Sequence, residues 1–177
     1  MPLLKTLLVA FALASFCSCS TNESRSPNAS LSIEDGYLSG ILPDGWRQIP
    51  TLKDSVSQVY VTTFRNDETE GNYVISISED VSASVLSDEN YLDVIKMQYG
   101  SLPSFEFLDK TEVTLHGKLF HSLHFNNLTA GSMSVYAFRT GEHAINIIWA
   151  SPSETVGHKD SSFREIDERF SMNWERL

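Results

Sequence analysis

The segment KLFHSLHFNNLTAGSMSVYAFRTGEHAINIIWA, residues 118–150, decides the fold of this chain. Its side chains alternate in character along three runs, which are separated by residues 126–131 and 140–141. Such period-two alternation, in sequence rich in β-branched and aromatic residues and interrupted by Gly and Asn, predicts an antiparallel meander of three strands. The third run is apolar on both faces except at His143 and Asn146, which is typical of a central strand covered on both sides.

A helical pattern precedes the meander. Over residues 87–102 large apolar side chains recur at spacings of three and four, which predicts an amphipathic helix. Ser87 is placed to cap its N-terminus, Asp88 and Glu89 suit the positive end of the helix dipole, and Gly100 is placed to close its C-terminus.

A second helical pattern follows the meander. Ser162 and Glu165 have the spacing of a capping box, which predicts the start of a helix. Helical spacing is also kept by the apolar side chains Phe163, Ile166, Phe170 and Trp174. We therefore expect an α+β fold in which an antiparallel sheet is packed between helices as an α/β/α sandwich.

Strand patterns occupy the region before the first helix. Residues 37–42 predict a strand that ends in the Pro-Asp-Gly turn at 43–45, and residues 56–64 and 72–78 predict a hairpin. Trp46 follows the turn directly. We expect its ring to pack over the sheet edge as part of the core, with a ligand platform as the alternative.

Two short strand patterns, residues 105–109 and 111–115, lie between the first helix and the meander. They predict either two strands or one strand with an irregularity near Lys110. His116 and Gly117 then predict a turn into the meander.

The order of these elements, together with LPDGW at residues 42–46, resembles the PsbP/Mog-like fold superfamily. That superfamily includes photosystem extrinsic subunits, a Ran-binding protein and bacterial lipoproteins related to DcrB. The resemblance covers residues 35–176 and implies an antiparallel sheet between helices and, for most members, a role in binding or assembly. No catalytic motif belongs to the superfamily, so the resemblance implies no functional residue in this chain.

The first residues predict export. Lys5 is followed by an apolar run too short to span a bilayer as a mature helix, which predicts a signal peptide over residues 1–18. The end of this segment resembles a bacterial lipobox, in which cleavage precedes a cysteine that is then lipidated. Cys19 fits better than Cys17, because the small Ser18 stands before it. We therefore predict lipidation at Cys19 and a membrane-anchored lipoprotein of the cell envelope, on its periplasmic face; the alternative is an ordinary cleaved signal peptide with two incidental cysteines.

Composition bounds the rest of the chain. Residues 19–34, which are polar and rich in Ser and Asn, predict a flexible tether, and residues 35–177 predict a single α+β domain. Both cysteines precede this domain, so we expect no disulfide inside it. The formal net charge of −10 disfavours nucleic acid as a partner, because phosphate contacts need a basic patch.

The five histidines raise the question of a metal site. His121 and His124 are three residues apart, which places them on opposite faces of a strand, and His121 could meet His143 only if their strands were paired. The sequence has no HExxH or CxxC motif. We therefore predict no metal site and no cofactor. The histidines are interpreted as surface or half-buried strand residues; they are His116, His121, His124, His143 and His158.

Catalytic motifs are likewise missing from the sequence: it has no GxSxG and no glycine-rich phosphate loop. We therefore predict no catalytic residue and a non-enzymatic binding or assembly module, whose partner is an envelope protein or a small apolar ligand. The expected binding patch lies around Trp46 or the loop at residues 51–57. Two alternatives remain: an unrecognised hydrolase using scattered Asp, Glu and His, and a carrier of a small apolar ligand in a pocket between sheet and helix. If Trp46, Trp149 and Trp174 converge, they would line an apolar groove for a peptide or a lipid.

Overall fold

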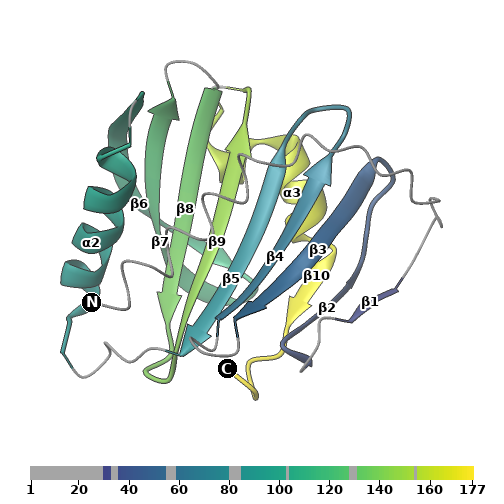
Figure 1. Ribbon diagram of the computed structural model, residues 1–177, viewed down its shortest axis with the longest axis horizontal. Helices are drawn as coiled ribbons and strands as arrows, with labels where there is room; N and C mark the ends of the chain where they lie inside the picture. The colour runs from purple at the N-terminus through teal and green to yellow at the C-terminus, as the bar shows by residue number, and fades with distance from the viewer. Residues whose placement is uncertain are drawn as a thin grey trace.

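The computed structural model describes residues 30–32, 36–54, 59–79, 85–102, 104–127, 131–153 and 155–177. The expected signal peptide, Cys19 and residues 20–29 and 33–34 of the expected tether lie outside the described residues, whereas residues 30–32 form a short strand. The elements, shown in Figure 1, are in chain order β1 (Ser30–Ser32), β2 (Leu38–Ile41), β3 (Trp46–Asp54), β4 (Val59–Asn66), β5 (Asn72–Glu79), α2 (Asp88–Gly100), β6 (Phe105–Leu115), β7 (Lys118–Asn127), β8 (Gly131–Arg139), β9 (His143–Ser151), η2 (Gly157–Lys159), α3 (Ser161–Asp167) and β10 (Phe170–Met172).

Seven of the described strands form one antiparallel sheet in the order β3-β4-β5-β9-β8-β7-β6 (Figure 1). The predicted meander is confirmed, since β7 pairs with β8 and β8 with β9. The pairing of β5 with β9, which places Ile75 opposite Ile147, joins the N-terminal hairpin to the meander. The central position of β9 explains its run of buried residues from Ala144 to Trp149.

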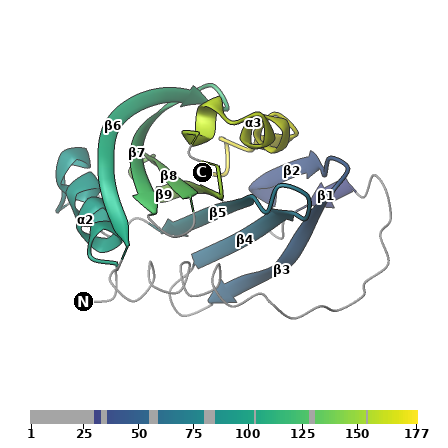
Figure 2. The same ribbon diagram turned by 90° about the horizontal axis from the view of Figure 1, so that it is seen from above.

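The helix α2 covers the outer face of this sheet, as Figure 2 shows. Its predicted N-cap is confirmed, because the Ser87 hydroxyl accepts a 3.2 Å hydrogen bond from the Asn90 N–H. The C-terminus differs from the prediction: Ser101 is the C-cap, in right-handed conformation, and Gly100 is the last helical residue. No helix in the described part of the chain is long and apolar enough to cross a membrane. Side chains of β4, β5, β7, β8 and β9 form one cluster with the buried Tyr91, Leu92, Ile95 and Tyr99 of α2.

A mixed layer covers the inner face of the sheet. The helix α3 is short and is capped by Asp160, whose carboxylate accepts a 2.9 Å hydrogen bond from the Ser162 N–H, so the predicted capping position was two residues late. The predicted helix is also wrong beyond Glu168, because Phe170 begins β10, which pairs with β2. Together β1, β2 and β10 form a small antiparallel sheet. The fold is therefore α+β and mainly antiparallel, but the second layer of the expected sandwich combines this small sheet with one short helix.

The strands β6 and β7 form a long hairpin that curls over the inner face, as Figure 2 shows. The predicted turn between them is confirmed: His116 and Gly117 have φ of 50° and 77°, the left-handed conformation of tight hairpin turns. The strand β6 is continuous, with a register shift between Phe107 and Asp109. The irregularity that we predicted is thus present, centred on Leu108.

The tryptophans belong to the packing of the inner face. Trp46 and Trp149 are 7% and 0% exposed, and their ring centroids lie 6.1 Å apart. Trp174 packs against the Phe138 ring at 5.5 Å. Trp46 is therefore a core residue, as expected, and the three rings do not line a shared groove. Of the predicted loop at residues 51–57, residues 51–54 belong to β3, and residues 55–57 lie outside the described residues.

Candidate functional site

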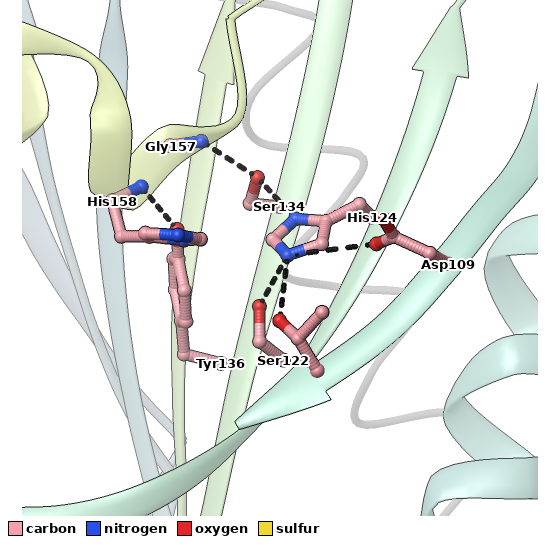
Figure 3. Close-up of polar contacts among 8 residues, drawn as sticks. Asp109, Ser122, His124, Ser134, Tyr136, Gly157 and His158 are labelled. Atoms are coloured by element: carbon pink, nitrogen blue, oxygen red, sulfur yellow. Dashed lines mark hydrogen bonds and ion pairs between the residues drawn. The ribbon is translucent and has the colours of Figure 1, made fainter. Parts of the chain in front are cut away.

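A buried constellation of polar side chains surrounds His124 on the inner face of the sheet (Figure 3). This side chain is 2% exposed, so the prediction of a surface or half-buried residue was wrong here. Its Nε2 shares hydrogen bonds of 2.8 Å with Ser122 Oγ and 3.3 Å with Thr111 Oγ1, and its Nδ1 shares one of 2.9 Å with Ser134 Oγ. Hydroxyl groups from β6, β7 and β8 therefore satisfy both ring nitrogens.

A β-bulge brings a carboxylate to this imidazole. Phe107 pairs with Phe125, but after the bulge at Leu108 it is Asp109 that pairs with His124. The carboxylate Oδ1 lies 3.8 Å from Nε2, which is too long for a hydrogen bond, and the side chain of Asp109 is 57% exposed. Bulges often re-aim a side chain in this way. One inserted residue thus places a solvated carboxylate, rather than leucine, beside the ring.

The segment around η2 closes the constellation from the side of α3 (Figure 3). The Gly157 N–H donates a 3.0 Å hydrogen bond to Ser134 Oγ, and the His158 N–H donates one of 2.6 Å to the Tyr136 hydroxyl. A Cβ on Gly157 would lie 2.6 Å from that hydroxyl, so only glycine fits. The ring centroids of His158 and His124 are 5.6 Å apart, so two histidines distant in sequence become neighbours.

Burial makes both imidazoles weak bases. It lowers the pKa of His124 from 6.5 to about 4, and the charge of Asp109 opposes this only in part. Burial also lowers the pKa of His158, and the charge of Lys159 acts in the same direction. Protonating His158 would further lower the pKa of His124. Both rings are therefore neutral at pH 7 and hold the network as uncharged hydrogen-bonding groups.

Ser122, His124 and Asp109 are not arranged as a catalytic triad. In a triad the nucleophile and the carboxylate bind opposite nitrogens of the imidazole. Here both lie on the Nε2 side, and Ser134 holds Nδ1. The hydroxyl-bearing residues Ser122 and Ser134 are 0% and 1% exposed, so a substrate has no access to them. The hydrogen bonds of this constellation link β6, β7 and β8 to the η2 segment. They are sensitive to pH, because protonation of His124 would place a charge inside the network.

A second buried polar cluster attaches α3 to the sheet. Asp167 Oδ1 accepts a 2.6 Å hydrogen bond from the Tyr73 hydroxyl and lies 3.0 Å from His116 Nε2. Burial is the main cause that raises the pKa of Tyr73 well above its ordinary value, and the charge of Asp167 acts in the same direction. The His116 carbonyl accepts a 2.9 Å hydrogen bond from Trp174 Nε1. With the side chains of His116 and Asp167 only 7% and 12% exposed, this cluster holds α3 and the β6–β7 turn together.

The other two histidines lie apart. His121 is on the outer face, opposite to His124 as predicted, and its Nδ1 is 3.3 Å from Glu112 Oε1. His143 Nδ1 is 3.0 Å from the carbonyl oxygen of Leu177, on a strand that β8 separates from β7. His121 and His143 therefore do not meet. Within the described ranges, no group of three or more His, Cys, Asp or Glu side chains is placed to hold a metal ion.

The sequence did not indicate that His124 and His158 are neighbours or that His116 contacts Asp167. The partners in each case come from elements far apart in the chain. One local signal was present: Ser122 and His124 are two residues apart on a strand, which places a hydroxyl and an imidazole on the same face.

A pocket of about 80 Å³ lies on the outer face, between the first half of α2 and the strands β7 and β8, and we call it the α2 pocket. The guanidinium of Arg139 forms one wall: its Nη1 donates 3.0 Å hydrogen bonds to the Leu86 carbonyl and to Asp88 Oδ1, and the group lies 5.0 Å above the Tyr91 ring. The other side chains around it include Leu119, His121 and Ala137. In contrast to the His124 constellation, this feature is accessible from outside.

The comparison with solved structures identifies the fold. The solution structure of cyanobacterial PsbP (CyanoP) from Synechocystis sp. PCC 6803 matches with a TM-score of 0.54 and 15% sequence identity, over 89% of this chain and 99% of that chain. This chain has a PsbP-like fold. The resemblance that the sequence suggested is thereby confirmed at the level of fold. No protein-family model matches the sequence, and no curated protein matches it.

Proposed function

We propose that this protein is a non-enzymatic binding or assembly module of the bacterial cell envelope, related to the DcrB-type lipoproteins. The proposal rests on the positions of the polar side chains in the fold. The clusters around His124 and Asp167 are buried and serve the packing of the fold, whereas the α2 pocket is open to a partner. The PsbP-like fold supports the proposal, because the superfamily that the sequence resembles consists mostly of binding and assembly factors.

We further propose that the protein is exported and held at the periplasmic face of a membrane by lipid on Cys19. The support is in the sequence, where a basic residue, a short apolar run and Ser18-Cys19 follow one another. A single acyl chain gives only marginal membrane binding, and stable anchoring needs more than one. The modification of bacterial lipoproteins supplies more than one chain at the cysteine.

Affinity capture tests the binding role. The full chain, tagged at its C-terminus, is captured from its own envelope in mild detergent, with the unanchored Cys19→Ser variant as the control. We expect an envelope protein to co-purify in a fixed ratio with the anchored chain and to bind again after the two are separated. Recovery of the same proteins by an unrelated tagged lipoprotein would contradict a specific role.

A turnover screen tests the absence of catalysis. The purified chain is incubated with ester, peptide, phosphoester and glycoside substrates, and we expect no turnover with any of them. Turnover that persists through purification, and that is lost on replacing His121, His124 or His143 by Gln, would overturn the proposal.

A second candidate function is the carriage of a small apolar ligand, because the α2 pocket lies between sheet and helix, where the carrier hypothesis places the ligand. The pocket volume of about 80 Å³ argues against this, because sites for drug-sized ligands measure roughly 300–1,000 Å³. Native mass spectrometry of the full chain released from detergent distinguishes the two. A small molecule retained by the chain would favour the carrier function. A mass equal to that of the lipidated chain, with nothing bound, would favour a pocket that receives a side chain of a partner protein.

A further inference from the structure

Part of the lining of the α2 pocket is apolar, beside the polar wall that Arg139 forms. Its base is formed by Ala137, which is 2% exposed, and one wall by the ring of Tyr91, which is 3% exposed. Leu119, at 54% exposure, stands at the rim as one of the large apolar side chains that the described fold leaves in solvent. A volume of about 80 Å³ admits the stem of one long side chain. The pocket is therefore built to bury a few methylene groups.

The charges exposed at the mouth are acidic. Asp88, which lines the pocket from α2, has a side chain that is 67% exposed. Glu112 on β6 has a side chain that is 54% exposed and lies 3.3 Å from His121, another lining residue. The side chain of Arg139 is only 7% exposed and is bonded to Asp88, so the carboxylate is the member of this ion pair that faces solvent. Asp88 and Glu89, in the first turn of α2, offset the positive end of the helix dipole.

The charge of the whole chain has the same sign, with 23 acidic residues against 13 basic ones. A field of this sign attracts basic partners and repels acidic ones. A partly apolar pocket with carboxylates near its mouth matches a side chain that has a hydrocarbon stem and a cationic head, because such side chains bury the stem and keep the charge in water.

We propose that the α2 pocket receives a lysine or arginine side chain from a basic segment of a partner protein. The stem lies against Ala137 and Tyr91, and the cation lies between Asp88 and Glu112. This inference rests on the proposed function and names the chemistry by which the binding module recognises its partner.

Fluorescence anisotropy with short peptides tests the recognition directly. The probe is a fluorescein-labelled, N-acetylated octapeptide of alternating Lys and Gly, added to the full chain in detergent. In one matched peptide norleucine replaces Lys and keeps the stem without the charge; in another, 2,4-diaminobutyric acid keeps the charge on a stem that is two methylenes shorter. We expect the Lys peptide to bind at least about tenfold more tightly than either, because norleucine lacks the charge that the carboxylates attract and the shorter stem forfeits two buried methylenes.

Variants of the protein locate the site. Ala137→Met fills the pocket and removes the preference for Lys over the short-stem peptide. Glu112→Gln weakens binding of the Lys peptide by about twofold to fivefold, the size expected for an exposed ion pair. Glu106→Gln makes the same change of charge at an exposed position on the opposite face of β6 and leaves binding unchanged. Leu119→Lys, at an exposed rim position, weakens binding without filling the core, so the test stands even if Ala137→Met does not fold.

Equal binding of the Lys and short-stem peptides would show attraction to the acidic surface in general and would overturn the proposal. So would an undiminished preference for Lys in folded Ala137→Met and in Leu119→Lys, or no binding of any peptide. An envelope protein that is captured by the wild type and equally by these variants would also overturn it, while leaving the binding function intact. Failure to capture any envelope protein would count against the proposed function. It would not decide what the α2 pocket binds, because the peptide measurements test the pocket separately.

Discussion

The neutral His124 at the centre of the inner network makes stability depend on pH. The folded pKa of His124 is lowered by burial to about 4, from an ordinary value of 6.5. In the unfolded chain the ring gains a proton below pH 6.5, whereas in the folded protein it stays neutral. The folded state is therefore fully stable above pH 6.5 and loses stability as the pH falls from 6.5 towards 4.

The size of this loss follows from linkage. The complete shift corresponds to about 3 kcal/mol. At pH 5 the unfolded chain binds this proton almost fully and the folded chain binds little of it, so about 2 kcal/mol is lost relative to pH 7.5. That is a substantial part of a total of about 5–15 kcal/mol. The lowered pKa of His158, whose ring lies 5.6 Å away, adds to the loss in the same direction.

Urea unfolding followed by tryptophan fluorescence measures the effect, since two of the three indoles are buried on the same face. The variant is His124→Gln, which keeps hydrogen-bonding groups but has no proton to gain. We expect the wild type to lose about 2 kcal/mol more than this variant between pH 7.5 and pH 5. His121→Gln removes a histidine from the other face of the same strand, where the side chain is 32% exposed, and serves as the control. Equal losses in the wild type and in His124→Gln would refute the reasoning.

Three further predictions concern packing and anchoring. Ile95 in α2 is 0% exposed, and Ile95→Asp should lower the free energy of unfolding in urea by more than about 3 kcal/mol. Met97 is 74% exposed, and Met97→Asp should lower it by under about 1 kcal/mol. Similar losses would contradict the assignment of Ile95 to the buried face of the helix. Gly71→Ala places a Cβ against a buried indole ring and should lower the free energy of unfolding by about 1–3 kcal/mol. The Cβ of Gly100→Ala meets no atom, so this variant should stabilise α2 by about 0.5–1 kcal/mol. The opposite order of stabilities in the same unfolding assay would refute both expectations. Cys19→Ser should move the protein from the membrane fraction to the soluble fraction, and an intact mass showing an unmodified Cys19 in the membrane-bound wild type would contradict the anchor.

Much of the fold could be predicted from the sequence, because it depends on local relations. Alternation along residues 118–150 predicted three paired strands, and the strands β7, β8 and β9 follow it. The turn at His116 and Gly117 depends on the conformation of two adjacent residues, and the cap at Ser87 spans three residues to Asn90. Each of these signals joins residues that are already neighbours in the chain, so no knowledge of distant partners is needed.

The C-terminal segment shows where local pattern becomes ambiguous. Phe163, Ile166 and Phe170 have helical spacing, yet Phe170 and Met172 also alternate as in a strand. The tertiary structure selects the strand, because β2 offers a pairing edge and the Phe170 ring packs 4.6 Å from that of Phe64. A short apolar segment fits both periods, and its packing partners make the choice.

The candidate sites depend on tertiary structure still more. One inserted residue at Leu108 brings Asp109 opposite His124, and the η2 segment brings His158 beside it. The α2 pocket likewise forms only where one helix meets two strands. The sequence by itself therefore determined the meander, the strand candidates β2 and β4 to β6, the turn at His116 and Gly117, the first helix and the acidity of the chain, whereas it did not indicate the strands β1, β3 and β10. The order of the strands, the burial of the histidines and the position of the pocket were decided by contacts between residues far apart in the chain, which no local pattern encodes.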